Sequence, residues 1–448
     1  MKTAKTIRMT AAFLAACLGC NVLAEDPAIS NVVVRQRWPW SRLVNIDYTL
    51  HCAPTQRMDI IVSAYNATFP LTLAPQSLSG DLSAVVPGPR RIVWDPAKTA
   101  YTNDLLTRFR VDLTPRPVPL YMIVDLTKTK GDAGQIEYVY EEDLFTNKWG
   151  SAASAWVRDP VTNKGEVVES VIWTGVTNDI VYKTSKLVLR RIPAGTYMKG
   201  FNADIPVTLT KAFYAGVFEV TQDQWNRIMV ATPAYFKVDG AARPVEQVSY
   251  NAIRGATNSS PAINWPATGS AVLSTSFLGK LREKTGSLDF DLPTETQWEC
   301  LCRAGTTTLY NDGKDGTPNG ESNAFMNVLG RYKWNGGAYW NADSNAWLLA
   351  TTVFGPTNGT AIVGSYQPNA WGLYDTHGNV WEWCRDWNIF PRLDEPVDAQ
   401  GPLSGTERLI RSGCWNQPAL GCYSRVSYPY FPTYALNYVG FRVISALP

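Results

Sequence analysis

The stretch Asn369-Ala-Trp-Gly-Leu-Tyr-Asp-Thr-His-Gly-Asn-Val-Trp-Glu-Trp-Cys384 combines glycine, asparagine and tryptophan at short intervals. Glycine and asparagine favour tight turns, and tryptophan supplies large planar side chains for a core. The chain as a whole shares this bias, since its 448 residues include 33 Gly, 17 Trp and 21 Tyr. About 140 residues of this character follow Gly305. Loops of that length stay ordered only when bridges, ions or packed aromatics hold them, so we predict a loop-rich domain with short strands.

Three short helices are predicted upstream of this stretch. Thr221 and Thr294 each stand three residues before a glutamine, which is the capping-box pattern of a helix start. The remaining helix is predicted from about Ser270 to Lys284, with Gly286 past its end. Its apolar face would consist of Leu273, Phe277, Leu278 and Leu281.

The N-terminal part has a different period. Between Ile29 and Thr114, apolar and polar residues alternate in several short runs separated by Pro- and Gly-bearing turns. The runs are Val44 to Leu50, Asp59 to Tyr65, Arg90 to Trp94 and Phe109 to Leu113. They predict an antiparallel β-sandwich of the immunoglobulin or fibronectin kind over residues 27–115. Its expected role is that of a spacer or docking module.

Two further boundaries follow from composition. The segment Thr114-Pro-Arg-Pro-Val-Pro119 is typical of a stiff linker. Residues 116–186 are therefore interpreted as a linker and connecting region, with one strand from Tyr121 to Leu126. The loop-rich domain is predicted to occupy residues 187–448, so the fold class is mixed α+β preceded by a β-sandwich.

The first residues have the pattern of an export signal over residues 1–24. Lys2, Lys5 and Arg8 precede a short apolar run, and Ala24 ends a small-residue cleavage site. An alternative is a bacterial lipobox that would leave a lipid anchor on Cys17. We expect an exported protein, either periplasmic, secreted or at the cell surface. No transmembrane segment is predicted, because no apolar run reaches 18 residues.

Charge and histidine content exclude several classes of function. Removing the three basic residues of the signal from 41 leaves 38 against 39 acidic residues, so a nucleic-acid partner is not expected. The only histidines are His51 and His377, which cannot supply a three-histidine metal site. We interpret His377 as a loop residue held by a hydrogen bond.

The C-terminal part contains an ordered series of motifs that is specific enough to compare with a known family. They are Ile192-Pro-Ala-Gly-Thr-Tyr-Met-Lys-Gly200, Phe218-Glu-Val-Thr221, Pro244-Val-Glu-Gln-Val-Ser-Tyr250, Leu292-Pro-Thr-Glu-Thr-Gln-Trp-Glu299, Cys302-Arg-Ala-Gly305, Gly378-Asn-Val-Trp-Glu-Trp-Cys384, Arg411-Ser-Gly-Cys-Trp415 and Gly440-Phe-Arg442. This series resembles the formylglycine-generating enzyme family, also called the sulfatase-modifying factor family. The resemblance covers Leu187 to the C-terminus and implies a C-type lectin-like fold with long packed loops.

The resemblance also implies a chemistry, from which this chain departs at one position. Oxidising members convert a sulfatase cysteine to formylglycine with Cu⁺ held by two cysteines, and soft thiolates suit that ion. Aligned on the glycine-rich motif, the second copper cysteine falls on Cys422 and the first on Gln417. A rearranged pair of Cys414 with Cys422 is an alternative. We favour a structural role in which Cys422 is bridged, with Cys302 as the candidate partner.

A calcium site is the second implication of the resemblance. By the family match, Asp375 and Glu382 would supply carboxylates while Gly378 and Val380 supply carbonyl oxygens. Oxygen ligands of this kind suit a hard cation such as Ca²⁺.

Two functions are therefore compared. The first is an exported, non-oxidising, calcium-stabilised lectin-like domain that binds a protein or glycan. The alternative is a formylglycine-generating oxidase with an atypical copper site, acting on an exported sulfatase. The glutamine at position 417 favours the first.

Overall fold

The structure is a computed structural model that describes residues 27–37, 39–52, 58–71, 73, 77–82, 85–98, 108–145, 153–158, 167–200, 202–255, 272–315, 325–336, 338–341, 346–349, 358–389 and 396–447. The predicted signal segment, including Cys17, lies outside these residues. The chain divides into two compact units, Met1–Val118 and Pro119–Pro448. Within the described part, no helix has the length and apolar character that crossing a bilayer requires.

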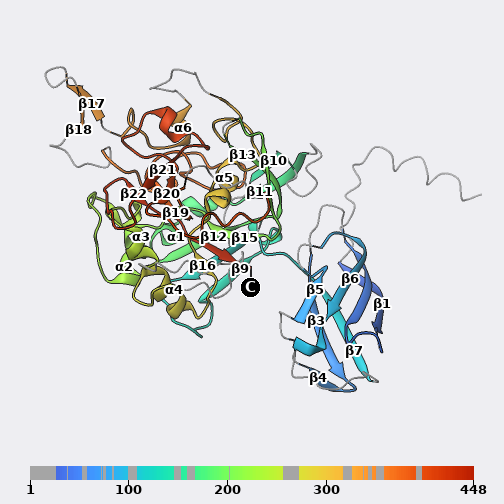
Figure 1. Ribbon diagram of the computed structural model, residues 1–448. Coiled ribbons are helices and arrows are strands. Elements are labelled where there is room, and N and C mark those ends of the chain that lie inside the picture. The colour runs from blue at the N-terminus through green and yellow to red at the C-terminus, as the bar shows by residue number, and fades with distance from the viewer. Residues whose placement is uncertain are drawn as a thin grey trace, which may run out of the picture. The chain divides into compact units, whose positions relative to one another are not determined.

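The first unit contains two antiparallel sheets (Figure 1). One has the order β1-β2-β6-β5 and the other β4-β3-β7. The strands are β1 (Ala28–Gln36), β2 (Val44–His51), β3 (Met58–Asn66), β4 (Phe69–Leu71), β5 (Leu78–Gly80), β6 (Gly88–Trp94) and β7 (Phe109–Pro117), and a 3₁₀ turn spans Pro96–Lys98. Alternate residues of β2 are buried, and both sheets contribute to one apolar core. This agrees with the sheet region predicted from the period-two runs.

The end of β7 corrects the predicted linker. Thr114 to Pro117 belong to this strand, where Thr114 pairs with Ile61 and Pro117 with Met58. Proline has no backbone N–H to donate and is therefore restricted to strand edges and ends. Pro115 and Pro117, two of the three prolines that suggested a linker, thus stand in the last residues of a paired strand.

The second unit is organised around a six-stranded sheet of order β16-β23-β15-β12-β8-β9. Its strands are β8 (Tyr121–Asp125), β9 (Ile136–Val139), β12 (Lys186–Ile192), β15 (Phe213–Gly216), β16 (Phe290–Asp291) and β23 (Ile444–Ala446). In β8, Tyr121 and Ile123 join one hydrophobic core, whereas Met122 and Val124 join another. The sheet is therefore buried on both faces. Two strands of the region interpreted as a connector belong to it.

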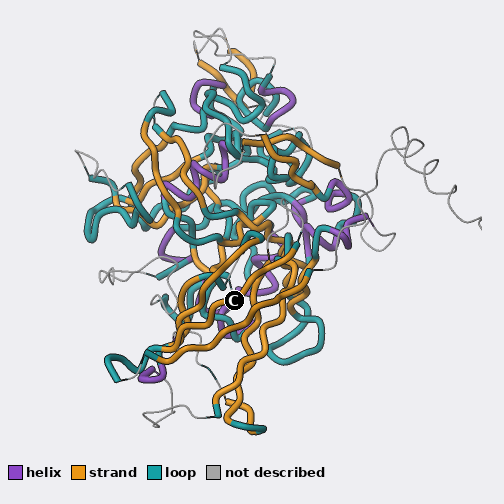
Figure 2. The backbone as a smooth tube through the Cα atoms, turned by 90° about the vertical axis from the view of Figure 1, so that its right-hand side faces the viewer, coloured by secondary structure: helices purple, strands orange, loops and turns teal. Residues whose placement is uncertain are grey.

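A second sheet, of order β21-β20-β19-β22, carries the motif stretch. Its strands are β19 (Trp381–Trp387), β20 (Arg408–Arg411), β21 (Ser427–Tyr430) and β22 (Val439–Gly440). Two-stranded sheets are formed by β10 (Ala153–Arg158) with β11 (Val167–Ile172), β13 (Gly195–Lys199) with β14 (Ile205–Leu209), and β17 (Ala338–Asn341) with β18 (Ala346–Leu349). Long loops connect these short elements (Figure 2).

The helices are short and mostly begin at a side-chain cap. They are α1 (Val181–Thr184), α2 (Gln222–Met229), α3 (Tyr250–Ile253), α4 (Phe277–Thr285), α5 (Glu295–Arg303) and α6 (Met326–Leu329). 3₁₀ turns span Glu142–Phe145, Thr174–Thr177, Gly240–Ala242 and Ala419–Cys422. The two predicted capping boxes are confirmed at Thr221 and Thr294.

The remaining predicted helix, α4, begins later than expected. Ser276 accepts a hydrogen bond from the backbone N–H of Gly279 and caps the helix there. Leu273 therefore precedes the helix and is 46% exposed instead of lying on its apolar face. Part of the predicted range, 270–271, lies outside the described residues. Gly286 ends the helix with a φ of 73°, as predicted.

Candidate functional site

The motif stretch is part of the interior of the second unit. Every residue from Trp371 to Trp387 is buried. Gly378 has a φ of 97°, and a Cβ there would lie 2.2 Å from the carbonyl oxygen of Arg331. Only glycine fits such a position. The neighbouring Asp375 and Asn379 also have positive φ, at 58° and 67°.

Hydrogen bonds tie this turn to distant parts of the chain. The Gly378 N–H donates to the Ser412 carbonyl over 2.9 Å, and the Asn379 N–H donates to that of Arg331 over 2.7 Å. The Asn379 side chain donates to Glu219 Oε2 over 2.6 Å, and the Val380 N–H donates to Glu219 Oε1 over 3.1 Å. The carboxylate of Glu219 thus accepts hydrogen bonds from both residues that follow Gly378.

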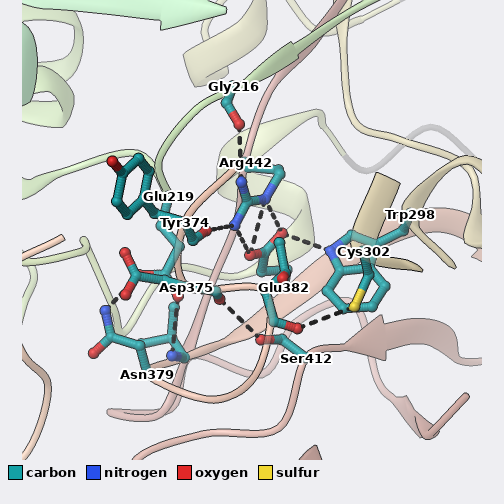
Figure 3. Close-up of polar contacts among 12 residues, drawn as sticks. Gly216, Glu219, Trp298, Cys302, Tyr374, Asp375, Asn379, Glu382, Ser412 and Arg442 are labelled. Carbon is teal, nitrogen blue, oxygen red and sulfur yellow. Dashed lines mark hydrogen bonds and ion pairs between the residues drawn. The ribbon is translucent and has the colours of Figure 1, made fainter. Parts of the chain in front are cut away.

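An ion pair lies beside the turn (Figure 3). Arg442 Nη2 is 2.7 Å from Glu382 Oε1, and both side chains are fully buried. Arg442 Nε and the indole N–H of Trp298 each donate to Glu382 Oε2, over 2.7 and 2.6 Å. Burial alone would lower the pKa of Arg442, but the carboxylates around it outweigh this effect and raise the pKa. Both oxygens of Glu382 are therefore engaged by protein donors.

Asp375 has a different environment from Glu382. Its Oδ2 accepts from the Gly364 N–H over 2.7 Å, while its Oδ1 is buried without a hydrogen-bond partner. Burial raises the pKa of Asp375 to about 6. Burial, together with the nearby Asp375 and Glu382, also raises the pKa of Glu219 well above its ordinary value. This turn therefore concentrates acidic groups around a single arginine.

The four predicted calcium residues differ in how they fit an ion. Asp375 offers a buried oxygen that lacks a partner, whereas the carboxylate of Glu382 is occupied by Arg442 and Trp298. The carbonyl of Gly378 already accepts from Ser412 Oγ over 3.0 Å. Within the described ranges, no group of three or more His, Cys, Asp or Glu side chains could hold a metal ion. Glu382 therefore does not fit a ligand role, and calcium binding stays a prediction.

The two candidate copper thiols are buried and hydrogen-bonded to their own loop. Cys414 Sγ donates to Asn416 Oδ1 over 3.0 Å, and Cys422 Sγ lies 3.8 Å from the Pro418 carbonyl oxygen. Burial raises the pKa of Cys422 to about 12 and that of Cys414 well above its ordinary value. Burial therefore favours the neutral thiol of both groups in the metal-free protein.

The expected bridge between Cys302 and Cys422 is not present. Both residues are free thiols, as are Cys300, Cys384 and Cys414. The ring of His377 contacts both of them instead. Its Nδ1 lies 2.7 Å from the Cys422 carbonyl oxygen, and its Nε2 is 3.9 Å from Cys302 Sγ.

The hydrogen bonds of His377 indicate its tautomer. Nε2 accepts from the backbone N–H of Asn311 over 3.1 Å, so the ring proton resides on Nδ1 and is donated to the Cys422 carbonyl. His377 is therefore a loop residue satisfied by backbone groups. This confirms the interpretation made from the sequence. Burial alone would lower its pKa, but Cys302 beside it outweighs burial and raises the pKa.

A family model described as "Sulfatase-modifying factor enzyme 1-like domain" matches residues 184–447. The chain belongs to the sulfatase-modifying factor family. The formylglycine-generating enzyme of Mus musculus is 33% identical over 134 residues, which are 30% of this chain and 32% of that protein. The chaperone protein LppX of Paenibacillus barcinonensis is 30% identical over 230 residues, covering 48% of this chain and 74% of that protein.

The match to the curated formylglycine-generating enzyme of mouse thus spans about a third of that protein's length. Among solved structures, Treponema denticola variable protein 1 is 23% identical with a TM-score of 0.41, covering 58% of this chain and 96% of that chain.

Two residues of the sulfatase-modifying factor domain were missed by sequence reasoning. Glu219 and Arg442 organise the motif turn, yet no role was predicted for either. Both stand inside motifs that were recognised, Phe218-Glu-Val-Thr221 and Gly440-Phe-Arg442. A glutamate or an arginine among apolar neighbours indicates a buried charge that requires a partner. This pattern could have been used to predict that both side chains bind groups of the motif stretch.

Proposed function

We propose that this chain is an exported, non-oxidising member of the sulfatase-modifying factor family, whose C-type lectin-like domain binds a protein or glycan ligand. The observation that carries the proposal is the residue at position 417. Gln417 stands where the first copper cysteine would be, so the fully buried Cys422 has no thiol partner there. An amide cannot replace a thiolate as a ligand for Cu⁺.

The arrangement around position 417 supports this proposal. The Gln417 N–H donates to the Cys414 carbonyl over 3.0 Å, and the Gln417 carbonyl accepts from the Lys333 N–H over 2.9 Å. A Cβ on Gly421 would lie 3.1 Å from Gln417 Oε1, so the amide packs against the turn that carries Cys422. A copper site built like that of the oxidising members would therefore lack its first thiolate at position 417.

Peptide oxidation tests the proposal. The reduced protein, supplied with Cu⁺ and oxygen, would be incubated with a cysteine-containing peptide taken from a sulfatase, and the products analysed by mass spectrometry. We expect no formylglycine, because Gln417 cannot supply the second thiolate that a two-cysteine Cu⁺ site needs. Conversion of the peptide would establish the alternative, an oxidase with an atypical copper site.

Calcium is proposed as a stabilising ion held by Asp375 with the carbonyl oxygens of Gly378 and Val380. The buried Oδ1 of Asp375 supports this, because a hard cation would satisfy an oxygen that has no hydrogen-bond partner. We expect calcium to raise the melting temperature of the wild type but not that of Asp375→Asn. Calorimetry that detects no calcium binding to the wild type would contradict it.

A further inference from the structure

Exposed aromatic rings gather at one edge of the second sheet. Strand β21 is the edge strand, and the segment that follows it leads back to β22. Tyr428, Phe431 and Tyr434 are 48%, 44% and 45% exposed, although phenylalanine is usually buried. We define the aromatic ridge as Tyr428, Tyr430, Phe431, Tyr434 and Tyr438.

Ring contacts join four of the five ridge residues, and Tyr428 instead packs edge-on against Trp381, with ring centroids 5.2 Å apart. The rings of Phe431 and Tyr434 have centroids 5.3 Å apart, and those of Tyr430 and Tyr434 are 6.1 Å apart. The hydroxyl groups of Tyr430 and Tyr438 are 3.2 Å apart. Such contacts reduce the rotamer freedom that ligand binding would otherwise have to remove.

The backbone of the ridge is fixed as well. The Pro432 carbonyl accepts from the Asn251 N–H over 3.1 Å, and the Leu436 carbonyl accepts from the Gln247 N–H over 2.9 Å. The Tyr438 carbonyl accepts from the Trp381 N–H over 2.8 Å. The ridge is therefore anchored to the core of the unit at three points, which keeps the exposed rings in place.

The chemistry of the ridge favours an uncharged ligand with many hydroxyl groups. No charged residue occurs from Val426 to Phe441. Tyrosine rings offer apolar faces together with hydroxyl groups that donate and accept hydrogen bonds. A sugar has matching features, since its ring has apolar C–H faces and a rim of hydroxyl groups. An ionic ligand would find no partner of opposite charge within this segment.

A peptide added as a further strand fits this edge less well. Pro429 stands in the middle of β21 and has no N–H to donate to an incoming strand. The exposed ring side chains, rather than the backbone of β21, are thus the groups available for recognition.

We propose that the aromatic ridge binds a neutral carbohydrate. The inference rests on the proposed binding function and names the ligand class and the surface. The ridge residues lie outside the turn formed by Asp375 to Glu382, so the surface is separate in sequence from the predicted calcium residues.

Affinity electrophoresis of the full chain tests the proposal. The gels would contain laminarin, dextran, galactomannan or arabinoxylan as neutral probes, and polygalacturonate as an acidic one. We expect at least one neutral polysaccharide to slow the protein, and Phe431→Ala with Tyr434→Ala to weaken that binding at least tenfold. The matched control is Phe69→Ala, which removes a ring that is 75% exposed in the first unit. It should bind like the wild type.

Other outcomes would overturn the proposal. They are no retardation by any of the four neutral probes, retardation by polygalacturonate alone, or unchanged binding in the double variant. Tyr434→Phe keeps the aromatic ring and should bind the polysaccharide within about threefold of the wild type. It shows whether weaker binding in the double variant comes from the missing rings or from a misfolded domain. The peptide oxidation assay is independent of these gels, so failure of the carbohydrate proposal would be distinguished from oxidase activity.

Discussion

At the scale of single residues, buried charges decide the structure around the motif stretch. Glu382 and Arg442 form a fully buried pair, and the indole of Trp298 completes the partners of the carboxylate. The sequence predicts Glu382 as a metal ligand, but in the structure its carboxylate pairs with an arginine 60 residues away. An ionised carboxylate in the interior is stabilised by a cation, and a sequence alone does not say whether that cation is a metal or a guanidinium.

Glu382→Gln is therefore expected to destabilise the domain strongly. It leaves Arg442 buried without its charge partner, which costs about 3 to 5 kcal/mol in unfolding free energy. The measurement is equilibrium unfolding in urea. The control is Asp223→Asn, which breaks a partly exposed i,i+4 pair with Arg227 and should cost about 0.3 to 0.5 kcal/mol. A loss below about 1 kcal/mol for Glu382→Gln would contradict the assignment.

At the scale of elements, turns that need glycine fix how the loops pack. Gly378→Ala would place a Cβ 2.2 Å from the Arg331 carbonyl oxygen and force alanine into a φ of 97°. We expect the variant to fail to fold or to melt far below the wild type. Gly313→Ala is the matched control, because Gly313 has a φ of 79° with nothing within 4 Å of the added Cβ. It should cost only about 1 kcal/mol. Equal melting temperatures for the two variants would show that the contact with Arg331 is unimportant.

Removing a helix cap is expected to reduce stability less than replacing Gly378. Thr294 accepts from the Gln297 N–H over 3.1 Å, and Gln297 Oε1 accepts from the Thr294 N–H over 2.8 Å. Thr294→Ala should lower the unfolding free energy by about 1 kcal/mol, as measured by urea unfolding. No loss of stability would mean that tertiary packing alone holds α5.

The capping residues and the period-two runs could be recognised from the sequence because their signals are local. Strand β8 was recognised, but its place in the central sheet was not. Its run Tyr121-Met-Ile-Val124 is apolar on both faces, which indicates a strand covered on both sides, although nothing local names the partner β12. The expected disulfide was wrong for a similar reason, because cysteine spacing does not show that His377 contacts both residues.

At the scale of the whole molecule, buried acids set the pH dependence of stability. Burial raises the pKa of Asp375 to about 6 and the pKa values of Asp386 and Glu246 to about 7. In the unfolded chain these carboxyl groups ionise near their ordinary pKa values of about 4. Stability from a raised acid is present below the unfolded pKa and is lost as the pH rises through the folded pKa.

The sulfatase-modifying factor domain should therefore be more stable at pH 5 than at pH 8. Asp291 acts in the opposite sense, because Arg254 and Arg385 outweigh burial and lower its pKa, but its effect is complete above about pH 5. Urea unfolding at four pH values from 5 to 8 measures the trend. Asp386→Asn should flatten it. A stability that rises with pH over this range would contradict the burial of these acids.

The central claim is that the cysteines near the C-terminus do not form a copper site. The most direct measurement is a competition titration of the reduced protein with Cu⁺, compared with that of Cys422→Ser. We expect weak binding that is the same in both proteins, because Gln417 stands where the second thiolate of the site would be. Tight binding by the wild type that is lost in Cys422→Ser would contradict it.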